Sequence, residues 1–132
     1  MKTEKTTINR VATSSTGFKA ADNILHNWGC TASQTQDILK IPNSTYFKYR
    51  ADPQSASLTD DQLERISYIL SMHSALRVVF DNQDNVRDFM SMKNHNPYFE
   101  GRTPLEVISS GRFGDLYEVF TRIDALRSGQ WE

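Results

Sequence analysis

The stretch that decides the fold of this chain is residues 96–107, which read Asn-Pro-Tyr-Phe-Glu-Gly-Arg-Thr-Pro-Leu-Glu-Val. Thr103 can cap a helix with its hydroxyl, Pro104 suits the first helical position, and Glu106 completes a capping box three residues after the cap. The preceding Asn-Pro pair and Gly101 favour a tight loop. Local rules therefore predict a loop followed by a short helix, but they do not explain why the two motifs occur at this spacing.

Outward from this stretch, apolar residues at helical spacing and capping residues recur along the chain, and no alternating strand pattern is present. The second predicted helix is capped by Thr31 or Ser33, and the longest opens with the capping box Thr59–Gln62. Asn43 or Ser44 can cap the third helix. The predicted helices cover residues 18–28, 34–39, 45–50, 60–80, 85–90, 104–109 and 115–127. The fold class is therefore predicted to be all-α.

Composition restricts the class of protein further. The 132 residues, 38% hydrophobic and 23% charged, are typical of one soluble globular domain or two very small ones sharing a core. No apolar run approaches the roughly 20 residues of a membrane span, and the polar start lacks the apolar core of a secretion signal. The single Cys30 excludes an intramolecular disulfide, so we expect a cytoplasmic protein. Residues 1–16, rich in Thr and Ser, are expected to form a disordered tail.

The net charge of −1 hides a difference between the two halves of the chain. Residues 1–52 carry seven Lys and Arg against four acids, and residues 53–132 carry eight against twelve. A basic first half suits an anionic partner such as DNA, although an imbalance of this size also arises by chance.

Signals of catalysis are weak. The three histidines are far apart in sequence, and none pairs with Cys30 at a metal-ligand spacing. No glycine-rich phosphate loop or nucleophile elbow is present. We therefore predict no catalytic residue, no metal site, no cofactor and no small-molecule substrate.

Residues 32–50 favour a helix-turn-helix, in which two short helices meet at a tight turn and the second helix enters the DNA major groove. An ordinary corner between two helices with a polar outer face explains the same pattern. Phe47 is expected to face inward and hold the second helix on its neighbours, as one of the tyrosines beside it could do. Under the DNA-binding interpretation the predicted contacts to bases and phosphates are Asn43, Ser44, Thr45, Tyr46, Lys48, Tyr49 and Arg50.

Two further residues each have two interpretations. Trp131, the second-last residue, either folds back onto the core or anchors a partner. Arg102 either caps a neighbouring helix end or meets an acidic partner.

With these residues in view, the chain resembles the MbcA/ParS/Xre antitoxin family of bacterial toxin–antitoxin systems. The likeness covers roughly residues 18–129 and is most specific where Asn96-Pro97 is followed by Gly101-Arg-Thr-Pro-Leu105. Residues 76–80, 84–90 and 120–123 agree with it. The weaker part is a similarity of residues 38–70 to the family's Xre-type helix-turn-helix.

The resemblance implies a helix-turn-helix region over residues 17–58 and a toxin-binding domain over residues 59–132. It implies a homodimer that binds a RES-domain toxin, a protein that consumes NAD, and closes the toxin's NAD pocket with its C-terminal helix and tail. It also implies repression of the operon through operator DNA. Carried over, the predicted toxin contacts are Arg102, Arg122, Arg127, Gln130, Trp131 and Glu132.

One departure from the family bears on DNA binding. The turn before the second helix of the helix-turn-helix often holds Gly in this family, where this chain has Lys40. A left-handed backbone there costs a non-Gly residue about 1 kcal/mol, or the turn differs. The alternative to an antitoxin is a stand-alone helix-turn-helix transcriptional regulator with no toxin partner.

Overall fold

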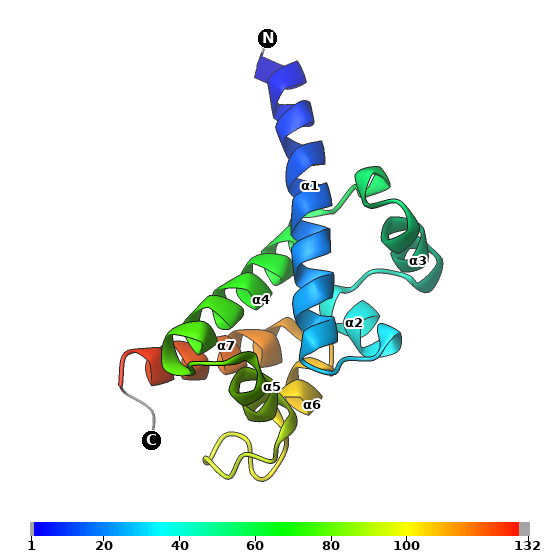
Figure 1. Cartoon of the computed structure of the whole chain (residues 1–132). Helices are drawn as coiled ribbons and strands as arrows, with labels where there is room; N and C mark the ends of the chain where they lie inside the picture. The colour runs from blue at the N-terminus through cyan, green and yellow to red at the C-terminus, as the bar shows by residue number, and fades with distance from the viewer. Residues whose placement is uncertain (1, 130–132) are drawn as a thin grey trace.

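The computed structural model describes the backbone of residues 2–129 and the side chains of residues 13–129 (Figure 1). Within this range the structure has no strand, which confirms the all-α prediction. The helices are α1 (Lys2–Asn27), α2 (Ala32–Leu39), α3 (Asn43–Ala51), the short 3-10 helix η1 (Pro53–Ser55), α4 (Asp60–Val79), α5 (Gln83–Ser91), α6 (Pro104–Ile108) and α7 (Phe113–Arg127).

The long helix α4 is the centre of the molecule and packs against both α1 and α7 (Figure 1). It begins at the predicted capping box, where the Thr59 hydroxyl accepts from the Gln62 N–H at 3.1 Å and the Gln62 side chain accepts from the Thr59 N–H at 2.9 Å. Ile66, Ile69 and Leu76 lie on its inner face and are buried. The apolar stripe predicted for this helix therefore faces the core.

Both halves of the chain contribute to one hydrophobic core. The largest side chains with less than 2% of their surface exposed are Trp28, Phe18, Phe99, Leu25, Ile38, Leu39, Ile69, Met72, Leu76, Met90, Ile108 and Leu116. Burying one such side chain contributes about 1.5 to 3 kcal/mol, so the two regions stabilise each other. The predicted boundary between them at residue 59 stays a prediction.

The first helix starts earlier than the sequence predicts. Residues 1–16 are expected to be disordered, but α1 is helical from Lys2, and Ser14 is only 1% exposed. The Ser14 hydroxyl accepts a hydrogen bond from the Leu58 N–H at 3.2 Å. Ser and Thr weaken a helix only slightly, and no Pro interrupts this segment, so a helix begun on the buried side chains near Phe18 extends back through it.

Three other helix starts differ from their predictions. At α3 neither Asn43 nor Ser44 is the cap, because the helix already begins at Asn43, with Pro42 before it and no side-chain cap. Helix α5, predicted from residue 85, is capped by Asn82 and starts at Gln83, and α7, predicted from residue 115, starts at Phe113. Such shifts of one or two residues are usual at helix ends.

The loop and short helix at residues 96–107 agree with the prediction. Thr103 and Glu106 form the capping box of α6, with Pro104 in its first turn. Before it, Glu100 and Gly101 both have left-handed backbones, with φ of 53° and 84°. Phe99, with no exposed surface, fixes this loop to the core.

Candidate functional site

The helices α2 and α3 meet at the turn expected of a helix-turn-helix. Of the two candidate caps of α2, Thr31 is the one used, in a capping box with Gln34. The helix ends at Lys40, which has a left-handed backbone with φ of 57° and ψ of 46° and donates its N–H to the Gln36 carbonyl. Lys40 therefore adopts the conformation that Gly would adopt more easily, at a cost of about 1 kcal/mol.

Two side chains of α4 hold this turn in place. Gln62 Nε2 donates to the Lys40 carbonyl at 2.8 Å. Arg65, 6% exposed, donates through Nη1 to the carbonyls of Ile38 at 3.4 Å and Gly111 at 3.0 Å. Its Nε pairs with Asp61 at 2.9 Å. Arg65 thus links the turn before α3 to the turn before α7, a role that the sequence does not reveal because a charged residue on a helix is usually exposed.

The inner face of α3 is aromatic and corrects part of the predicted DNA contacts. Tyr46 is 2% exposed and Tyr49 7%, and both rings meet Phe18 edge to face at centroid distances of 5.9 and 5.6 Å. The Tyr46 hydroxyl donates to Asp22 at 2.5 Å, and the Tyr49 hydroxyl donates to the Ser57 carbonyl at 3.0 Å. These two tyrosines hold α3 on α1, so they are too buried to serve as DNA contacts.

Phe47, which was expected to face inward, lies on the outside of α3 with 47% of its surface exposed. In a helix of nine residues with three consecutive large or aromatic positions, the buried face follows from the neighbouring helices rather than from the pattern. The other outward residues are Asn43, Ser44, Lys48 and Arg50, while Thr45 is half-buried. This face presents hydrogen-bonding groups at its start and positive charge further along, the arrangement with which such helices contact bases and phosphates.

In the C-terminal half, Arg102 is used inside its own loop. Its Nε donates to the Phe99 carbonyl at 2.9 Å and its Nη2 to the Tyr98 carbonyl at 2.7 Å. Its guanidinium lies 5.5 Å from the centre of the Tyr98 ring, which Arg122 approaches to 4.6 Å. These bonds fix the shape of the loop and are not those of a helix cap. The contact of Arg102 with an acidic partner or a toxin stays a prediction.

Tyr98 connects this loop to α7. Its hydroxyl donates to Asp115 at 3.2 Å. Burial, followed by the charge of Asp115, raises the pKa of Tyr98. The phenol therefore stays protonated at neutral pH and acts as a fixed hydrogen-bond donor.

An apolar groove of about 450 Å³ runs between α4 and α7. Val78 is its most exposed apolar residue, with 71% of its surface accessible, and Tyr117 on α7 is 45% exposed. Arg127, a predicted toxin contact, lines the groove and pairs with Asp124 at 2.8 Å. The complete lining is Leu70, Ser71, Ser74, Ala75, Val78, Phe120, Asp124 and Arg127. The predicted contacts Gln130, Trp131 and Glu132 lie outside the described residues.

The described side chains offer little for catalysis. Burial raises the pKa of the Cys30 thiol to about 12, which leaves it protonated and unreactive at neutral pH. Burial, and then the charge of Arg77, lowers the pKa of His73. No group of three His, Cys, Asp or Glu within the described part of the chain is placed to hold a metal ion. In the same part, no helix has the length and apolar character needed to cross a membrane.

Comparison with known proteins identifies two domains in the chain. Residues 7–71 match the antitoxin Xre-like helix-turn-helix domain, and residues 75–129 match the antitoxin Xre/MbcA/ParS C-terminal toxin-binding domain. The chain is also 33% identical over 113 residues to the uncharacterized protein y4oB of Sinorhizobium fredii. The aligned residues cover 85% of this chain and 81% of that protein.

The fold and its surfaces define a helix-turn-helix protein with a second, toxin-binding helical domain. The chain belongs to the Xre/MbcA/ParS antitoxin family. Membership implies a toxin as protein partner and DNA binding by the helix-turn-helix, and it points to a regulatory protein rather than an enzyme.

Proposed function

We propose that this chain neutralises a RES-domain toxin by covering the toxin's NAD pocket, and that as a homodimer it represses its own operon through α3. The match of residues 75–129 to a toxin-binding domain is the observation that carries the proposal. The mechanism is steric: NAD cannot enter a pocket that another protein occupies. We propose that both activities occur in the cytoplasm, because a chain with one cysteine forms no intramolecular disulfide and suits a reducing compartment.

The surface that best suits the toxin is formed by α7 and the groove beside it. Protein interfaces favour exposed apolar and aromatic side chains flanked by Arg. This surface offers the exposed Val78 and Tyr117, the half-buried Phe120, and Arg127. Arg122, half-buried against Tyr98, lies on the same helix. Residues 130–132, the other predicted toxin contacts, follow α7 in the sequence after Ser128 and Gly129 and remain part of the proposal.

The DNA half of the proposal rests on the outward face of α3. Asn43 and Ser44 at its start are suited to base edges, and Lys48 and Arg50 to phosphates. The tie from Arg65 and Gln62 keeps the preceding turn fixed, so α3 need not be reordered when it enters the major groove.

Co-expression in bacteria tests the occlusion mechanism. The RES-domain toxin encoded beside this gene is expressed with the full chain, with a chain ending at Gly129, and with a chain ending at Leu126. The full chain should restore growth and cellular NAD, and the chain ending at Leu126 should restore neither, because Arg127 and the tail are gone. Full rescue by the shortest chain would refute occlusion by the tail, and the chain ending at Gly129 separates residues 130–132 from Arg127.

A further inference from the structure

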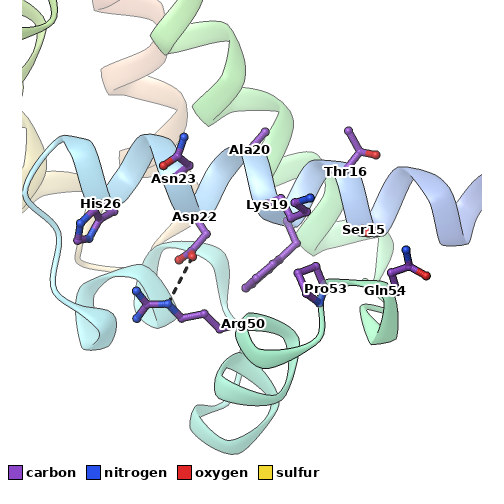
Figure 2. Close-up of a pocket in the computed structure, with 11 residues that line it drawn as sticks. Ser15, Thr16, Lys19, Ala20, Asp22, Asn23, His26, Arg50, Pro53 and Gln54 are labelled. Atoms are coloured by element: carbon purple, nitrogen blue, oxygen red, sulfur yellow. Dashed lines mark ion pairs between the residues drawn. The ribbon is translucent and has the colours of Figure 1, made fainter.

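A groove of about 840 Å³ lies beside α3, between α1 and η1. Figure 2 shows Arg50 reaching from α3 toward Asp22 on α1, while Pro53 and Gln54 on η1 lie opposite Ser15 and Lys19. None of the sequence motifs discussed above includes the α1 side of this groove.

The groove is lined mainly by side chains that donate hydrogen bonds. Lys19, Asn23 and His26 are exposed and recur at intervals of four and three residues, which places them on one face of α1. Gln54 and Arg50 face them from the other wall. Hydroxyl, amide, ammonium and guanidinium groups of this kind are the ones that contact DNA phosphates.

Among the described residues that line the groove, the one carboxylate is already engaged. Asp22 accepts the Tyr46 hydroxyl through one oxygen and lies 3.8 Å from Arg50 through the other. Its side chain is 18% exposed, against 51% for that of Arg50. Lys19 has no ion-pair partner among the described side chains. The groove therefore presents positive charge to solvent.

Arg50 joins this groove to the outward face of α3. Asn43, Phe47 and Arg50 follow one another at intervals of four and three residues, so they form one edge of that helix. A DNA strand bordering the major groove that receives α3 would pass along this edge and reach the wall formed by α1.

We propose that the groove between α1 and η1 seats the sugar-phosphate backbone of operator DNA, with Lys19 and Arg50 as the phosphate-contacting cations. This inference rests on the DNA-binding half of the proposed function and adds a second contact surface to it. Contacts to phosphate carry no sequence information, so the groove sets affinity and orientation while α3 reads the bases.

The test uses the purified full chain and fluorescent duplexes tiled across the DNA upstream of its gene, with a random-sequence duplex beside them. Lys19→Gln should weaken binding to all duplexes alike, by about eightfold at about 0.1 M salt, and make the slope of log affinity against log salt shallower by about 0.9. Lys93→Gln removes the same charge at an exposed site outside the groove and should leave affinity and slope unchanged. Thermal unfolding and toxin neutralisation by both variants control for folding.

The outcomes separate the two levels of the proposal. Failure of the wild type to bind any duplex would refute DNA binding and the groove with it. Normal DNA binding by Lys19→Gln, with an unchanged salt slope, would overturn the groove alone. Loss of toxin neutralisation with DNA binding intact would also overturn it, because the groove would then face a protein.

Discussion

The positive charges on the two functional surfaces differ in what they touch. On α7 each Arg pairs with an acid within one turn: Arg122 with Glu118 at 3.6 Å and Arg127 with Asp124 at 2.8 Å. On α1 and α3, Lys19 and Lys48 have no ion-pair partner among the described side chains, and Arg50 lies 3.8 Å from Asp22 with 51% of its side chain exposed. Unpaired cations attract a polyanion, whereas paired ones beside exposed apolar groups suit a protein. The comparison separates a DNA-facing surface from a toxin-facing one within a single core.

Between the two surfaces lies Arg65, which contacts the turns that lead into α3 and α7. Replacing it by Met should lower the free energy of unfolding by about 3 kcal/mol, because the carbonyls of Ile38 and Gly111 lose a buried charged donor. Arg77→Met, on the exposed side of the same helix, should change it by less than about 0.5 kcal/mol. Urea unfolding measures both, and equal stability of the two variants would show that the tie is unimportant.

The packing of α3 on α1 should depend on pH in alkaline solution. Burial, with the hydrogen bond to Asp22, raises the pKa of Tyr46 from 10.0 to about 12. Between these values the unfolded chain loses a proton that the folded chain keeps, so this contribution to stability is full below pH 10 and falls by about 2 kcal/mol as the pH rises to 12. Tyr46→Phe should reduce this loss of stability between pH 10 and 12, whereas Tyr117→Phe, at an exposed position, should not. An alkaline profile identical in Tyr46→Phe and wild type would exclude this origin.

The left-handed turn before α3 should respond to Gly. Lys40→Gly should be more stable than Lys40→Ala by about 1 kcal/mol, because both remove the side chain and only Gly relieves the backbone strain at φ of 57°. The difference in urea midpoint between the two variants measures it. Equal midpoints would mean that the strain is compensated within the turn.

Charge removal on each surface should affect one activity and leave stability within about 0.5 kcal/mol of wild type. Replacing Lys48 and Arg50 together by Ala should abolish operator binding and spare toxin neutralisation. Arg127→Ala should weaken toxin binding by roughly 1 kcal/mol and spare operator binding. Gel-shift titrations measure operator binding and calorimetric titrations measure toxin binding for both variants. Loss of both activities in one variant would argue against separate surfaces. If the wild-type chain also failed to bind the toxin, the alternative function, a stand-alone transcriptional regulator, would be favoured.

The sequence predicts those parts of this molecule that are decided locally. The capping boxes at Thr31, Thr59 and Thr103 involve residues three positions apart, so each can be predicted from the sequence alone. The burial of Tyr46 and the exposure of Phe47 depend on where α1 lies, and a helix as short as α3 carries too little periodicity to show it.

The remaining differences have the same cause. Arg65 is buried because the carbonyls of Ile38 and Gly111, in two turns far from it in sequence, accept its hydrogen bonds. Nothing in the sequence of either turn indicates that it will accept a hydrogen bond from Arg65. The groove beside α3 likewise combines residues of α1 and η1 that nothing in the sequence connects. The sites formed by several elements could therefore not be predicted from the sequence, and neither could the start of α1 at Lys2, whereas the approximate positions of the other α-helices could.

The most direct test of the account uses any RES-domain protein that a neighbouring reading frame encodes: its consumption of NAD is followed while the full chain is added in increasing amounts. Occlusion predicts that the rate falls in proportion to the chain added and reaches zero at a fixed ratio of the two proteins. An unchanged rate in the presence of a large excess of the chain would contradict the central claim.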